Sequence, residues 1–171
     1  RSFHLHLLSL KKVNASLVKV DEDGTTGLSG AEFNLIAKED IKNADGKVIV
    51  KANTILKKYT SDAEGNIAID LDLPLNIDFA LKEVKAPVGY VLDQTEILFN
   101  TNYKGQDVDT IKISKTKENK PIKVEISKTD ITTGEELPGA TLQIKNEAGE
   151  VIEEWVSTDK PHTFEKLPVG N

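Results

Sequence analysis

One pattern occurs twice in this chain, and the second copy follows the first at a distance of 109 residues, from position 19 to position 128. Lys19 and Lys128 hold the same place in the two copies, and the Gly-Ala pair at 30–31 recurs at 139–140. The apolar positions around them keep the same parity, which is typical of an internal repeat. The 171 residues therefore suit one complete unit followed by the first part of another.

Each copy opens with alternating residues that predict a strand with one buried face. Ala15, Leu17 and Lys19 share that face in the first copy, and the corresponding face of the second copy reaches Lys128. An ammonium group without a partner is costly to bury. For a single strand, a shift of register or a side chain that reaches out to water would explain such a lysine. Its recurrence in both copies favours a function.

Short apolar runs separated by turn residues indicate an all-β fold. Gly-containing polar clusters at 43–46, 62–65 and 103–107 mark turns, and no segment has the period of an amphipathic helix. We expect an antiparallel β-sandwich of the immunoglobulin-like or prealbumin-like kind. Besides the opening strand, the expected strands of the first unit are 31–37, 47–52, 66–73, 77–84, 95–100 and 109–114.

The boundary between the units is expected at Pro121, directly before the second repeat begins. Residues 15–120 would form the complete sandwich and residues 121–171 the partial one. Residues 1–14 would be a preceding segment or an added sequence, and the apolar run at 3–10 within them is too short to span a membrane.

Composition excludes several functions. Without cysteine the chain has neither disulfides nor thiolate metal sites, and a net charge of −6 with mixed signs does not suit nucleic acid. His4 and His6 alternate on one strand but lack a third ligand, so no metal site and no cofactor are predicted. No phosphate loop, nucleophile elbow or metalloprotease motif is present, and we expect no turnover of external substrates.

Two other polar residues are candidates to meet Lys19. Glu83 shares a strand face with Phe79 and Leu81, and Asn119 lies at the end of the closing segment, with Asn100 as the alternative. Burial favours a neutral lysine amine, which is a nucleophile, and a protonated carboxylic acid, which can polarise an amide and move protons. Such a set could join lysine and asparagine through an amide bond and release ammonia.

The stretches "KVDEDGTTGLSGAEFNL", "ALKEVKAPVGYVL" and "NKP" together resemble the Cna protein B-type domain, also called the SpaA-like or prealbumin-like domain, of Gram-positive pilins and adhesins. The resemblance covers residues 15–119 fully and 122–171 in part. "EVKAPVGY" at 83–90 matches the family's E-box, Glu-x-x-Ala-Pro-x-Gly-Tyr, at every fixed position.

The resemblance implies an intramolecular isopeptide bond in which Lys19 is the nucleophile, Glu83 the proton shuttle and Asn119 the acceptor. Lys128 would be the nucleophile of the second unit, for which this chain supplies no acceptor. The implied function is a stalk module of a secreted, cell-wall-attached pilin or adhesin. Its partners would be neighbouring domains, other pilin subunits or host ligands. The alternative is a binding module whose loops recognise a host protein or glycan.

Overall fold

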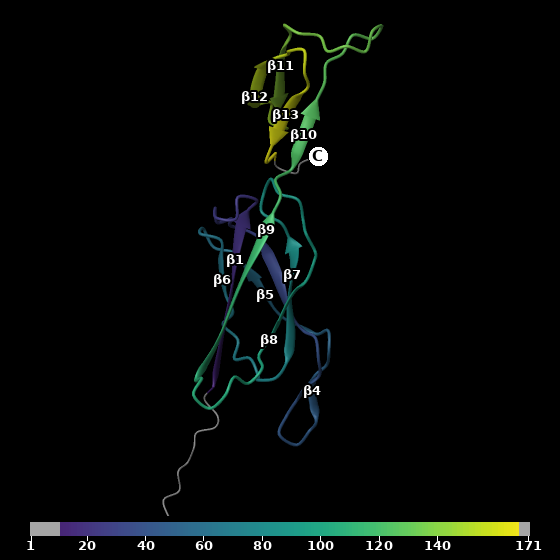
Figure 1. Ribbon diagram of the computed structural model, residues 1–171. Coiled ribbons are helices and arrows are strands. Elements are labelled where there is room, and N and C mark those ends of the chain that lie inside the picture. Colours follow the sequence, from purple (N-terminus) through teal and green to yellow (C-terminus); the bar gives the residue numbers. More distant parts are fainter. Residues whose placement is uncertain (1–10, 168–171) are drawn as a thin grey trace, which may run out of the picture. The chain divides into compact units, whose positions relative to one another are not determined.

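The computed structural model describes residues 11–167, which form β-strands joined by turns and loops, without a helix (Figure 1). The all-β fold class is therefore confirmed. Within residues 11–167 there is no helix that is long and apolar enough to cross a membrane. The chain divides between Pro121 and Ile122 into two compact units. The apolar run at 3–10, with His4 and His6, lies outside the described residues.

Two sheets make up most of the first unit. One has the order β6-β1-β9 and the other the order β5-β2-β7-β8, while β3 and β4 form a separate hairpin. β1 and β9 pair in parallel along their whole length, and the other pairings of these sheets are antiparallel. The strands are β1 (Lys12–Asp21), β2 (Glu32–Ala37), β3 (Ile41–Lys42), β4 (Val48–Val50), β5 (Ile55–Thr60), β6 (Asn66–Ala68), β7 (Asp78–Lys85), β8 (Ile97–Asn100) and β9 (Thr110–Asn119).

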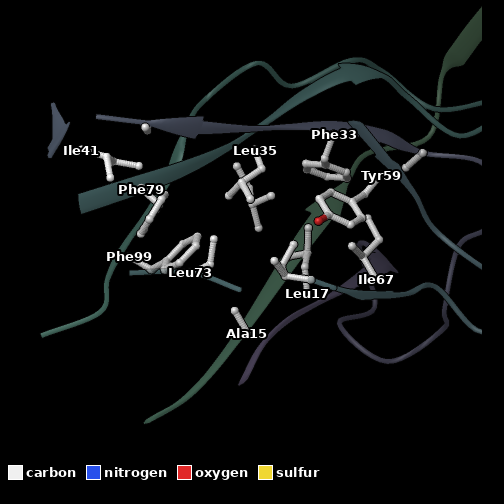
Figure 2. Packing of buried hydrophobic residues seen from close by; sticks show 14 residues of the cluster. Ala15, Leu17, Phe33, Leu35, Ile41, Tyr59, Ile67, Leu73, Phe79 and Phe99 are labelled. Carbon is white, nitrogen blue, oxygen red and sulfur yellow. The ribbon is translucent and has the colours of Figure 1, made fainter. Parts of the chain in front are cut away.

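The core lies between these two sheets, as in a sandwich (Figure 2). Side chains that alternate along each strand supply it, so its members come from both sheets. The fully buried ones include Leu17 of β1, Phe33 and Leu35 of β2, and Phe79 and Leu81 of β7. Phe79 stacks on Phe99 of β8 with ring centroids 5.5 Å apart.

Some strand bounds differ from the sequence-based ones for local reasons. β1 begins at Lys12, ahead of the expected start at residue 15, and β9 runs to Asn119 instead of ending at 114. β5 was not expected at all, because a register shift opposite Leu35 and Ile36 of β2 interrupts its alternation. The expected strand at 66–73 ends at Ala68, and Ile69 and Leu73 still pack into the core.

The second unit consists of two strand pairs, β10 with β13 and β11 with β12. Trp155 stacks on His162 and meets the edge of Phe164, with ring centroids 4.7 and 5.0 Å away, and Phe164 is buried. Apolar side chains at Ile131 and Ile152 are exposed. The strands are β10 (Lys123–Ile126), β11 (Thr141–Lys145), β12 (Val151–Val156) and β13 (His162–Glu165).

Candidate crosslinking site

Lys19 lies on the buried face of β1, and the backbone around it is fixed from both sides. Its amide N–H donates to the Gly65 carbonyl at 2.7 Å, and its carbonyl accepts from the Leu28 amide at 2.8 Å. Gly65 has φ +83°, and a Cβ there would lie 2.2 Å from the Lys19 carbonyl oxygen. Only glycine therefore allows this close approach.

Glu83 and Asn119 reach the same region from other strands. Glu83 lies on β7, opposite Phe33 of β2, and Asn119 is the last residue of β9, opposite Asp21 of β1. The side chains of Lys19, Glu83 and Asn119 are among the largest that are fully buried, with 0%, 0% and 2% of each residue exposed. Buried polar side chains of this size need partners.

Glu83 and Asn119 are joined directly. The Asn119 Nδ2 amide donates to Glu83 Oε2 at 2.9 Å and to the Val91 carbonyl at 2.6 Å. Glu83 Oε2 also accepts from the backbone N–H of Asp93 at 2.9 Å. The segment that follows the E-box, residues 91–93, therefore holds both the carboxyl group and the amide.

Two atoms of this group have no hydrogen-bond partner although they are buried, Glu83 Oε1 and Asn119 Oδ1. A buried acceptor left unpaired costs about 1–3 kcal/mol. Such atoms in an otherwise satisfied core often mark chemistry or stored strain. Here they belong to a carboxyl group and to the amide it contacts.

The Lys19 ammonium donates to two backbone carbonyls, that of Lys117 at 2.9 Å and that of Val20 at 3.2 Å. Burial lowers the pKa of Lys19 from 10.5 to about 8, and the negative charge of Glu83 opposes this shift. A much larger fraction of the amine is therefore neutral near pH 8 than for an exposed lysine.

The E-box tyrosine fixes the loop next to this site. The Tyr90 hydroxyl donates to Asp21 Oδ2 at 2.8 Å in the interior, and Tyr90 forms a β-bridge with Pro121. Val91, the next residue, donates its N–H to the Lys120 carbonyl. The box thus attaches the loop after β7 to the ends of β1 and β9.

The other two residues singled out from the sequence lie elsewhere. Asn100 is exposed and pairs with Asp78 at the opposite end of β7 from Glu83, so it is not part of the buried group. Lys128 follows the end of β10 and is exposed, with its backbone N–H donating to Glu136. The structure thus places Asn119, and not Asn100, beside Glu83.

Sequence reasoning missed two charged residues that adjoin the site, Asp93 and Lys117. Lys117 Nζ lies 2.6 Å from Asp93 Oδ2. Lys117 could have been found from the two-residue alternation of β9, because it shares the inward face of this strand with Ile111 and Asn119. No group of residues suited to hold a metal ion occurs within 11–167.

The first unit is thus a sandwich of two sheets with a buried lysine, glutamate and asparagine. The SpaA prealbumin-like fold domain matches residues 13–119 and again residues 122–171. The chain therefore belongs to the SpaA prealbumin-like family.

Several solved structures are similar to this chain. The Bacillus anthracis TIE protein is 28% identical with a TM-score of 0.51, and the match covers 93% of this chain and 27% of that one. The group B streptococcus pilus 2b backbone protein is 23% identical (TM-score 0.45; 63% and 40% covered). The streptococcal ancillary pilin is 21% identical (TM-score 0.47; 95% and 52% covered). The chain thus spans about a quarter to a half of these proteins. No curated protein matches it.

Proposed function

We propose that this chain is a load-bearing module of a bacterial surface pilin or adhesin, in which Lys19 and Asn119 become joined by an amide bond. The observation that carries the proposal is the convergence of Lys19, Glu83 and Asn119 in an apolar core, each at most 2% exposed. Nothing in a sandwich core requires these three polar side chains for stability. Together they form the set that amide exchange needs.

The reaction balances without any external reagent. Lys19 Nζ, as the neutral amine, attacks Asn119 Cγ, so the Nζ–Cγ bond forms and the Cγ–Nδ2 bond breaks. Glu83 takes a proton from Nζ and gives one to Nδ2, which leaves as ammonia. The 2.9 Å contact between Glu83 Oε2 and Asn119 Nδ2 already joins the carboxyl group to the leaving nitrogen.

The strand arrangement suits mechanical load. Because β1 and β9 are parallel, the start of β1 at Lys12 and the end of β9 at Asn119 lie at opposite ends of the pair. A pull between these points loads the pairing lengthwise. With the amide in place, the covalent path runs from β1 through Lys19 to Asn119 and bypasses the intervening strands.

Intact-mass spectrometry of the purified chain tests the proposal. We expect the parent to be lighter than its sequence by one ammonia, and fragmentation to locate the link between Lys19 and Asn119. Lys19→Ala, Glu83→Ala and Asn119→Ala should have their full sequence masses, while Asn100→Ala should still lose ammonia. A parent with its full sequence mass would overturn the proposal.

A binding module is the second candidate, because apolar side chains are exposed around the E-box. Val88, Val91 and Leu92 are 75%, 51% and 42% exposed, and exposed apolar groups close together favour contact with another protein. The test is binding of the chain to immobilised extracellular matrix proteins, compared with a variant carrying serine at these three positions. Equal signals would exclude this surface.

A further inference from the structure

Lys117 is a second inward-facing lysine next to the site, and the proposed chemistry does not use its amine. It lies two residues before Asn119 on β9, and only 11% of its side chain is exposed. Its ammonium contacts Asp93 Oδ2 at 2.6 Å and the Thr95 carbonyl at 3.4 Å. This ion pair attaches β9 to the segment between β7 and β8.

Each member of the ion pair also holds one of the reacting groups through its backbone. The Asp93 N–H donates to Glu83 Oε2 at 2.9 Å. The Lys117 carbonyl accepts from Lys19 Nζ at 2.9 Å. The contacts therefore form a continuous series from Lys19 through Lys117 and Asp93 to Glu83, and from there to Asn119.

We propose that the Asp93–Lys117 ion pair is the positioning element of the crosslinking site, holding the Lys19 amine and the Glu83 carboxyl group in register with the Asn119 amide. The inference rests on the proposed amide bond. Neither side chain exchanges atoms or protons in the reaction. Their effect is on geometry, to which rates are sensitive, because a displacement of about 1 Å can cost about a hundredfold in rate.

A pocket of about 530 Å³ adjoins the pair, and both Asp93 and Lys117 line it together with Asn119. Changes in these side chains can therefore be accommodated without overpacking the core. In particular, Lys117→Met and Asp93→Asn keep similar volume while removing one charge each. Substitution should thus loosen the 91–95 segment rather than unfold the sandwich.

The pair also has an electrostatic effect on Lys19, and its two members act in opposite directions. The charged groups that act on Lys19 are Glu83 of β7, Lys117 and Glu118 of β9, and Asp93; Glu118 is on the outward face of β9. Lys117 lowers the pKa of Lys19, whereas the three acidic groups raise it. Removing the Lys117 charge should therefore move the pH profile of crosslinking upward, and removing the Asp93 charge should move it downward.

The experiment follows the first crosslinking event in the full chain. The chain is synthesised in a cell-free system, collected in acidic denaturant, and diluted into refolding buffers at pH values either side of 8. Loss of ammonia is then followed by intact mass. The variants are Lys117→Met, Asp93→Asn and Lys117→Arg. The control is Lys57→Met, which breaks the ion pair between Lys57 of β5 and Asp70. In that pair Lys57 Nζ and Asp70 Oδ2 are also 2.6 Å apart.

We expect Lys117→Met and Asp93→Asn to crosslink on the order of tenfold more slowly than the parent or worse, with pH profiles displaced in opposite directions. Lys117→Arg keeps the charge and should restore most of the rate, and Lys57→Met should match the parent. The circular dichroism of each refolded variant shows whether it has folded.

Three results would count against these ideas, and they are distinguishable. If folded Lys117→Met and Asp93→Asn crosslink at the parent rate with its pH profile, the positioning role is wrong although the amide bond stands. A shift of the pH profiles of both variants in the same direction would also contradict the role proposed for the ion pair. If the parent itself loses no ammonia, the proposed function fails instead.

Discussion

Lys19 and Lys117 are direct partners in the parallel pairing of β1 with β9, and the Lys19 ammonium donates to the Lys117 carbonyl at 2.9 Å. Paired residues of neighbouring strands project to the same face of a sheet, so both lysines point inward. Each has an acidic group near it, Glu83 of β7 for Lys19 and Asp93 of the segment between β7 and β8 for Lys117. The strand that carries Asn119, the proposed acceptor, therefore also holds Lys19, the proposed nucleophile.

Loss of the amide bond should lower stability substantially. We expect Glu83→Gln, which keeps the shape of the side chain but cannot shuttle the proton, to retain its ammonia. Because the proposed bond would close a loop of about 100 residues, its loss should reduce the free energy of unfolding by about 4–5 kcal/mol. Denaturation in guanidinium chloride measures the free energy of unfolding of parent and variant, with reductant added to one series. Equal midpoints for parent and variant would contradict the prediction, and reductant should have no effect on either.

The uncrosslinked chain should become more stable as the pH rises. In Asn119→Ala the Lys19 amine remains free, and burial lowers its pKa in the folded state from 10.5 to about 8. Between these values the unfolded chain binds more protons than the folded one, so the free energy of unfolding increases with pH. The gain should approach about 3 kcal/mol above pH 10.5.

The parent, if crosslinked as proposed, provides the control for this pH effect, because its Lys19 would no longer titrate. Urea denaturation at matched pH values should show the rise in Asn119→Ala and not in the parent. Tyr59, whose pKa is raised to about 12 by burial, affects both proteins alike and cancels in the comparison. The absence of a rise in Asn119→Ala would show that Lys19 keeps an ordinary pKa, whereas the same rise in both proteins would show that the parent is not crosslinked.

Gly65→Ala should impair the site through the backbone of Lys19. An added Cβ would lie 2.2 Å from the Lys19 carbonyl oxygen, in addition to the strain of φ +83°. Gly46→Ala is the matched control, because Gly46 has φ +81° and nothing within 4 Å of an added Cβ. We expect the control to lose about 1–2 kcal/mol and to crosslink fully.

For Gly65→Ala we expect a larger loss of stability together with incomplete crosslinking. The uncrosslinked fraction is read from the intact mass after purification, and thermal unfolding gives the stability. The same yield and melting temperature in the two alanine variants would mean that β1 can shift away from residue 65 at no cost.

Amine labelling should separate the two repeat lysines. Lys128 is exposed and should react with acetic anhydride in the native chain. Lys19 should remain unlabelled even in concentrated denaturant, where burial no longer protects it and only an amide bond does. Peptide mapping after digestion gives both results. Labelling of Lys19 in denaturant would mean that its amine is free.

Alternation along single strands could be read correctly from the sequence. Ala15, Leu17 and Lys19 share a buried face in the structure, and so do Phe79, Leu81 and Glu83, because a two-residue period leaves only one choice of face. Asn119 was harder to place, since Lys117 precedes it on the same face and breaks the apolar pattern.

Contacts between distant segments could not be read in this way. Nothing in the local pattern shows that β1 and β9 pair in parallel or that a bulge lies between β2 and β5. Nor does it show that Asp93 forms an ion pair with Lys117, 24 residues further along the chain. These depend on which strands become neighbours, and pairing is decided by packing of the whole sandwich.

Every loop of the first unit between β1 and β9 lies between Lys19 and Asn119 in the sequence, including the exposed turn at 43–46. If these two residues are joined, a protease that cuts one of these loops makes a nick and not two fragments. The pieces stay in one molecule through the side chains of Lys19 and Asn119. Damage by secreted proteases at any of these turns would then leave the chain covalently continuous from end to end.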